Sequence, residues 1–341
     1  MAHNLNQAPN GKMALMYCGE VPWHGLGTRL NGPATSAEAL TEAQLDWDVL
    51  KVPLWAGVGM TSYPVPRHHA LVRSDLWGTS RCPILGVVGD GYEPLQNAEA
   101  FRFFDEIVGS KEAIYHTAGA LGQGERIWLL AKLPKSDFEV VPGDKVEPYL
   151  LLVNGHDGHT PIQIKLTTVR VVCQNTVIRA LEQGPTQRVH HGEGMRQRLW
   201  GAAKLLGVVQ QEIAGYQQSS QAMAKYPMNP AKLASYLNAI FPDPQRKPDQ
   251  PPDRQSPLLE VMHRHRARSA YYYDCGRGNH LPNVRGTLWA ALNGVTEYVD
   301  HELTSDKSPD DRFRAVLYGR GQLIKQKAYK QAEALVTQGV N

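Results

Sequence analysis

Alternation of apolar and polar positions dominates the first half of the chain. Residues 47–55 alternate closely enough to predict a half-buried strand, in which Pro53 favours an edge position or a bulge. Residues 69–73 and 84–88 predict two more short strands. Asn97 is suited to cap a helix that follows, in which Phe101, Phe104, Ile107 and Val108 recur at helical spacing.

Two pairs of strands with glycine-containing turns come next. Residues 113–121 and 125–133 flank Gly122-Gln123-Gly124, and residues 147–154 and 161–170 flank a turn at 155–160. Glycine permits the positive φ values that tight connections require. Successive hairpins of this kind predict an antiparallel sheet.

The period changes to that of helices after residue 171. An apolar stripe repeats at steps of three and four residues over Leu199, Ala202, Leu206, Val209, Ile213 and Tyr216. Further helices are predicted at about 230–241, from 288 to about 304, and at about 320–337.

These patterns predict an α+β fold, an antiparallel sheet of successive hairpins with packed helices, followed by a helical C-terminal part. We divide the chain into a hairpin-rich α+β core (1–185), a helical segment (186–241), a proline-rich loop or linker (242–257) and a mostly helical C-terminal part (258–341).

Composition narrows the class of protein. A hydrophobic content of 42% with 20% charged residues in 341 positions is typical of a globular chain. The formal net charge of +3 is too small to indicate a nucleic-acid-binding protein by itself, so any such signal must come from clustered charges. The four cysteines form no C-x-x-C pair, and no apolar run is long enough to span a membrane. We therefore expect free thiols and a cytoplasmic protein without membrane contact.

Three separated segments carry a family resemblance. They are Pro-Trp-His-Gly-Leu-Gly-Thr at 22–28, Thr-Thr-Val-Arg-Val-Val-Cys-Gln-Asn-Thr at 167–176, and Gly-Thr-Leu-Trp-Ala-Ala-Leu-Asn-Gly-Val-Thr-Glu-Tyr-Val-Asp-His at 286–301. In this order they resemble the phage/plasmid-like family numbered nine hundred and thirty-two among the domains of unknown function. That family is remotely similar to single-strand annealing proteins of homologous recombination.

The resemblance implies a function and partners. It implies ATP-independent binding and annealing of single-stranded DNA during recombination of phages and plasmids, by a homo-oligomer that forms a ring or filament. Single-stranded DNA is then the partner, and the need for a partner exonuclease stays open.

Basic residues gather in two parts of the chain, and the second part adds aromatic residues. The candidate DNA-binding residues are Lys165, Arg170, Arg179, Arg188 and Arg196, then Arg264, Arg266, Arg268, Tyr271, Tyr272, Tyr273, Arg277 and Arg285. Cations for phosphates and rings for bases are what single-stranded nucleic acid requires. A solvated helix face followed by a tyrosine-rich core strand is an equal alternative. On a strand, Tyr272 would face away from Tyr271 and Tyr273.

Two further clusters have an open role. Trp23, His24, Gly25 and Gly27 suit either a ligand-contacting loop or a packed N-terminal arm. His156, Asp157 and His159 could hold a metal ion, but the same residue types shape an ordinary hairpin turn.

The sequence shows no phosphate-binding or nucleophile motif. We therefore expect a binding protein that needs no cofactor and no metal. Two alternatives remain open: a metal-dependent nuclease or hydrolase that uses His24, His156, Asp157 and His159, and an element-encoded interaction protein with no nucleic-acid role.

Overall fold

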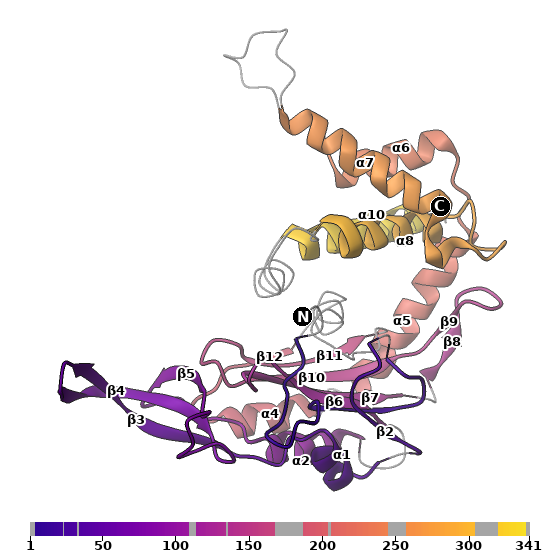
Figure 1. The fold of residues 1–341 in the computed structure, drawn as a ribbon. Helices are drawn as coiled ribbons and strands as arrows, with labels where there is room; N and C mark the ends of the chain where they lie inside the picture. Colours follow the sequence, from indigo (N-terminus) through magenta and orange to yellow (C-terminus); the bar gives the residue numbers. More distant parts are fainter. Residues whose placement is uncertain are drawn as a thin grey trace. The chain divides into compact units, whose positions relative to one another are not determined.

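The structure is a computed structural model that describes residues 4–22, 24–32, 34–108, 114–133, 136–167, 187–203, 206–244, 257–303 and 320–338. Within these ranges the fold is α+β, as the sequence predicts (Figure 1). The chain divides into two compact units, the first made of Met1–Asp137 with Glu147–Gln210 and the second of Phe138–Val146 with Gln211–Asn341. The four-segment division drawn from the sequence stays a prediction.

The first unit is built on a sheet of seven described strands in the order β12-β11-β10-β7-β6-β1-β2. The strands are β1 (Leu15–Cys18), β2 (Thr28–Leu30), β6 (Ile114–Leu121), β7 (Arg126–Lys132), β10 (Tyr149–Gly155), β11 (Ile162–Thr167) and β12 (Gln187–Val189). All neighbours pair antiparallel except β1 and β2. The two predicted hairpins are therefore confirmed as β6–β7 and β10–β11.

Helices cover one face of this sheet. Helices α1 (Ser36–Glu42) and α2 (Asn97–Val108) lie against it, and α4 (Met195–Ala203) packs beside α2 (Figure 1). Phe101 and Phe104 of α2 join Leu129 and Leu152 of the sheet in one buried apolar core. Burial of this face is the main stabilising contribution, because each large apolar side chain removed from water contributes about 1.5–3 kcal/mol.

The start of α2 differs from the sequence prediction. Helix α2 begins at Asn97, so Gln96 and not Asn97 precedes it, and the backbone N–H of Ala100 donates to the carbonyl of Gln96. The amide of Asn97 is fully buried and donates instead to the backbone carbonyls of Leu45 and Trp47. The predicted helix cap at Asn97 was wrong because these carbonyls, distant in sequence, need a donor inside the core.

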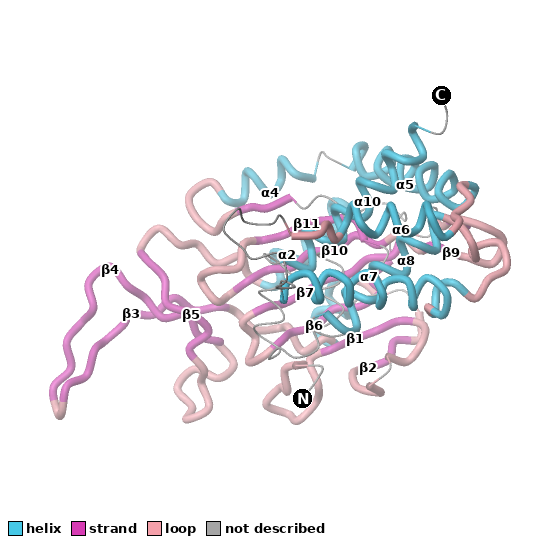
Figure 2. The backbone as a smooth tube through the Cα atoms, turned by 90° about the horizontal axis from the view of Figure 1, so that it is seen from above, coloured by secondary structure: helices cyan, strands magenta, loops and turns pink. Residues whose placement is uncertain are grey.

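A second, smaller sheet in the same unit consists of β3 (Val49–Val58), β4 (Thr61–Arg73) and β5 (Ile84–Gly89) in that order. Strand β3 is an edge strand, and its register with β4 shifts next to Pro53, as the proline predicts. Strand β5 pairs only with residues 68–72 of β4. The rest of the β3–β4 hairpin therefore projects from the unit as a two-stranded ribbon (Figures 1 and 2).

The second unit is mostly helical. It contains β8 (Phe138–Glu139), β9 (Lys145–Val146), most of α5 (Leu206–Lys225), α6 (Pro230–Ile240), α7 (Pro257–Cys275), a short 3-10 helix (Arg277–Asn279), α8 (Leu288–Tyr298), a π-helical turn (Val299–Leu303) and α10 (Arg320–Gln338). The side chains of Asn229 and Thr287 cap α6 and α8. No helix in the described ranges combines the length and apolar character needed to cross a membrane.

The three consecutive tyrosines lie on α7, not on a strand. The strand alternative was wrong because close packing of α7 against α8 continues the helix through them. Gly294 of α8 allows this approach, since a Cβ atom there would come within 2.6 Å of the Tyr273 nitrogen and 2.9 Å of the Ser269 oxygen.

Candidate nucleic-acid interface

The register of the seven-stranded sheet separates its residues into two faces. Trp128 pairs with Val153, Val153 with Gln163, and Gln163 with Arg188, so these side chains share a face. Their strand neighbours, such as Leu129 on β7, belong to the apolar core under the helices. We call the face opposite that core the basic face.

The basic face carries all the charge of the sheet. The seven strands contain no aspartate or glutamate, and their lysines and arginines all fall on this face: Arg29, Arg126, Lys132, Lys165 and Arg188. Three aromatic rings accompany them, Tyr17, Trp128 and Tyr149. Cations interleaved with aromatic rings on a sheet are the combination that nucleic-acid-binding surfaces use.

Carboxylates from loops and from neighbouring residues lie beside Arg126 and Lys132 on this face. The Arg126 guanidinium lies 3.2 Å from Asp157 in the β10–β11 turn. The Lys132 ammonium lies 2.5 Å from Glu147 and 3.6 Å from Asp137.

Exposure distinguishes the edges of the basic face from its centre. Arg29 on β2 and Arg188 on β12 are exposed and lie on the two edge strands. Lys165, predicted as a DNA contact, is only 3% exposed, and Trp128 and Tyr149 are buried with it. The centre of the face is therefore buried, while the edges offer cations that a phosphate can reach.

The other predicted cations near the last strand have different surroundings. Arg170 and Arg179 lie outside the described residues. Arg196 on α4 forms ion pairs with Glu93 at 3.2 Å and Glu99 at 3.0 Å. Burial raises the pKa of Glu99, but the hydrogen bonds and charge of Arg196 outweigh it and leave that pKa below its usual value. Arg196 thus holds α4 to the start of α2, which leaves it little capacity for phosphate.

In the second unit, α7 brings three of the predicted residues onto one side. Arg264, Arg268 and Tyr271 stand four and three residues apart, which places them on one face of the helix. Arg264 is exposed and makes no hydrogen bond or ion pair within the described part of the chain, and Tyr271 is 50% exposed. The Arg268 guanidinium lies 4.5 Å from the centre of the Tyr271 ring. We call these three residues the α7 stripe.

Carboxylates also hold two of the three α7 arginines. Arg268 donates to Glu302, which raises the pKa of the guanidinium further above its usual value, and Tyr272 donates to the same carboxylate at 2.9 Å. Arg266 donates to Asn238 and Asp243, at and beyond the end of α6. Sequence spacing suggested three equivalent phosphate ligands, whereas the structure leaves Arg264 as the one without a carboxylate partner among the described residues.

The last predicted residues lie beside the same helices. Tyr273 is half-buried, and its backbone carbonyl accepts from Asn279. Arg285 is exposed and donates to the carbonyl of Asn279 at 3.4 Å. The side chain of Arg277 lies outside the described residues.

The segment at residues 22–28 shows local packing. Trp23 lies outside the described residues. The ring Nδ1 of His24 accepts from the backbone N–H of Leu26 at 3.1 Å, and Gly25 has a positive φ of 68°. Gly27 has a φ of 99°, and a Cβ atom there would come within 2.7 Å of Leu15. These contacts favour the packed N-terminal arm.

The β10–β11 turn uses Asp157 as its internal acceptor. Its carboxylate accepts from the backbone of His159 and from both the backbone and hydroxyl of Thr160. Burial raises the pKa of Asp157, but these hydrogen bonds and the charge of Arg126 outweigh it and leave that pKa lowered. Within the described part of the chain, no three His, Cys, Asp or Glu side chains are arranged to hold a metal ion.

His156 is fully buried at the start of this turn. Its Nε2 lies 3.0 Å from the amide oxygen of Asn97, whose own N–H groups already donate, so Nε2 carries the proton. Nδ1 has no hydrogen-bond partner among the described residues. Burial, followed by the charges of His191 and Arg73, lowers the pKa of His156 to about 3. The ring is thus neutral at physiological pH.

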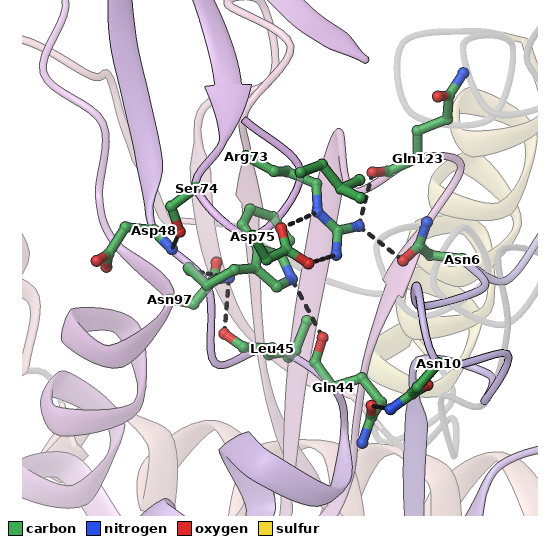
Figure 3. A network of polar contacts seen from close by, with 12 residues as sticks. Asn6, Asn10, Gln44, Leu45, Asp48, Arg73, Ser74, Asp75, Asn97 and Gln123 are labelled. Atoms are coloured by element: carbon green, nitrogen blue, oxygen red, sulfur yellow. Dashed lines mark hydrogen bonds and ion pairs between the residues drawn. The ribbon is translucent and has the colours of Figure 1, made fainter. Parts of the chain in front are cut away.

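A buried arginine joins the two sheets of this unit (Figure 3). Arg73, at the end of β4, donates to Asp75, to the amide oxygen of Asn6 at 2.9 Å and to the carbonyl of Gln123 at 3.0 Å. Its guanidinium also lies 4.4 Å from the centre of the Trp47 ring. The smaller sheet is therefore fixed to the β6–β7 turn and to Asn6 near the N-terminus.

Sequence reasoning missed several residues of the basic face. Arg29, Lys132, Tyr17, Trp128 and Tyr149 are far apart in sequence, so no linear cluster marks them. A local signal did exist on β7, where Arg126, Trp128 and Lys132 occupy alternate positions. Pairing register was needed to place the others beside them.

The described cysteines Cys18, Cys82 and Cys275 are free thiols, and Cys173 lies outside the described residues.

Comparison with known proteins gives one finding. Neither the curated proteins nor the solved structures contain a match to this chain. The sequence pattern of the family described as "Domain of unknown function (DUF932)" matches residues 84–332. That match spans most of the chain, including β5 to β12 and nearly all of the second unit, and the protein therefore belongs to this family.

Proposed function

We propose that the protein binds single-stranded DNA without ATP and anneals complementary strands during recombination of phages or plasmids. The observation that supports this best is the basic face: seven strands with no carboxylate, whose cations all project to one side together with aromatic rings. Annealing needs no acid, base or nucleophile. It needs a surface that neutralises phosphates and leaves the base edges able to pair.

Phosphates contact the exposed cations at the edges of the face. Arg29 and Arg188 lie on the strands at opposite ends of the sheet, about 30 Å apart at the usual strand spacing of roughly 4.8 Å. The α7 stripe offers a second contact, in which Arg264 meets phosphate and the exposed ring of Tyr271 stacks on a base.

Binding through several weak contacts gains from linked copies of the site, because each bound site raises the local concentration of the next contact. The active form in this proposal is a homo-oligomer, a ring or a filament.

Paired substitutions at the two edges test the proposal. We expect Arg29→Gln with Arg188→Gln to weaken binding of a labelled oligonucleotide for all sequences alike, measured by fluorescence anisotropy on metal-free protein without ATP. Arg81→Gln is the matched control, because Arg81 is an exposed arginine on a loop outside the sheet. Equal binding by the double variant and the control would contradict the assignment of this face.

A further inference from the structure

The distal part of the β3–β4 hairpin, residues 53–66, is an apolar ribbon that we call the arm. No charged residue occurs between Pro53 and Pro66. Four large apolar side chains on it are exposed, Trp55 by 58%, Val58 by 70%, Tyr63 by 58% and Met60 completely. Clustered exposure of this kind marks a contact surface, because a soluble protein seldom leaves a contiguous apolar patch in water.

The arm also has unpaired strand edges. Among the described residues, β5 pairs with residues 68–72 of β4 and with nothing further out, so both edges of the arm present backbone groups that no described strand pairs. A two-stranded ribbon without a covered face is marginally stable in water, and open edges favour pairing with another chain. The arm thus needs a partner surface.

The same sheet has an apolar surface of the matching kind. Register places six aliphatic residues on its side away from the core: Leu50, Val52, Ala70, Val72, Ile84 and Val87. The residues between them, such as Leu71 and Val88, face the core. We call this side the outer face. On it Ile84 is 60% exposed and Val87 is 45% exposed, Leu50 and Val52 are partly exposed, and Ala70 and Val72 are buried.

We propose that the arm of one copy of this chain packs on the outer face of the next copy. Neither surface carries a charged side chain, so their contact removes no charge from water. A nucleic-acid partner fits the arm poorly, because phosphates require cations that the arm lacks.

The contact joins two different surfaces and is therefore head-to-tail. A head-to-tail contact repeats from copy to copy and gives a ring where the rotation closes and a filament where it does not. The inference supplies the assembly that the proposed function expects, and it is tested without DNA so that each can fail separately.

Sedimentation of DNA-free protein over a range of concentrations tests the contact. We expect the wild type to form oligomers larger than a dimer, while Met60→Glu, on the arm, and Val87→Glu, on the outer face, each sediment as a monomer. An equal mixture of the two variants should form dimers and nothing larger, because it contains one intact arm and one intact outer face for each pair of chains.

Leu323→Glu is the control, since Leu323 is 64% exposed on α10 and lies far from this sheet in sequence. It should assemble as the wild type does, and thermal unfolding should confirm that all three variants are folded. A wild type that is monomeric at every concentration overturns the proposal. It does so even if that monomer pellets with phosphatidylcholine vesicles. So does a single variant that assembles as the wild type does, or a mixture that stays monomeric. A wild type that assembles as expected but binds no DNA supports the contact and contradicts only the proposed function.

Discussion

Single residues in the first unit carry large and separable contributions to stability. Arg73 is 1% exposed and donates hydrogen bonds to Asn6 near the N-terminus, to the β6–β7 turn and to Asp75. We expect Arg73→Met to lower the free energy of unfolding by about 3 kcal/mol, because it leaves the buried amide oxygen of Asn6 without its donor and removes the buried cation that pairs with Asp75. Urea unfolding measures the change.

Arg67 on the same strand provides the control. Its side chain is 85% exposed and lies 3.5 Å from Asp90. Arg67→Met should change the free energy of unfolding by less than about 1 kcal/mol, as is typical of exposed ion pairs. Similar losses in both variants would show that burial of the Arg73 network contributes little.

His156 makes stability depend on pH. Its pKa is about 3 in the folded protein against an ordinary value of 6.5. Above pH 6.5 the ring is neutral in both states. As pH falls below 6.5 the unfolded chain takes up a proton that the folded protein refuses, so stability falls by up to about 1.4 kcal/mol for each pH unit.

Replacing His156 with Gln removes this proton while keeping an N–H donor for Asn97. We expect the decline in unfolding free energy between pH 6.5 and 4.5 to be shallower in His156→Gln than in the wild type. Burial also lowers the pKa of His191, to about 4, so part of the decline remains in the variant. Parallel curves for the two proteins would contradict the folded pKa assigned to His156.

At the scale of elements, α7 separates a binding arginine from a structural one. Arg264→Ala should weaken binding of single-stranded DNA and reduce the salt dependence by about 0.7 in the slope, without changing stability. Arg266→Ala should lower the free energy of unfolding by about 1 kcal/mol, because Arg266 joins α7 to Asn238 and Asp243.

Binding isotherms and urea unfolding on both variants measure the difference. Equal effects of the two substitutions on DNA binding would show that position on the helix does not matter, and that the α7 stripe is a solvated surface.

The elements that the sequence predicted are those specified by local signals. The β6–β7 hairpin follows from alternating apolar residues around Gly122 and Gly124, which have φ values of 64° and 111°. The tyrosines were misplaced because packing of α7 against Gly294, distant in sequence, overrides the strand preference of Tyr. For the arm, the sequence predicted only a strand near Pro53, because the exposure of the arm depends on where β5 stops pairing with β4.

The candidate site was predicted in part, for the same reason. The α7 stripe was found because its residues are close in sequence. The basic face was predicted only at Lys165 and Arg188, since its other members meet through strand register, as where Tyr17 pairs with Thr117, and Lys165 itself is buried. Sequence spacing also hid the carboxylates that hold Arg266 and Arg268.

At the scale of the whole molecule, a formal net charge of +3 is modest, so any affinity for DNA must come from the way the cations are distributed. The cations on the seven strands of the first unit share one face of the sheet, and Arg264 and Arg268 in the second unit share one side of α7. A surface with this distribution should hold nucleic acid mainly through its phosphates, with little preference for sequence.

The most direct measurement is a salt titration of wild-type protein with single-stranded DNA, free of metal and ATP. Each phosphate that a cation neutralises releases counterions, so the logarithm of the association constant should fall linearly with the logarithm of salt concentration, with a slope of about −0.7 for each contact. We predict a steep slope equivalent to several contacts, the same for oligonucleotides of different sequence. Absence of binding at low salt, or a slope near zero, would contradict the proposal that the cations of this protein bind single-stranded DNA.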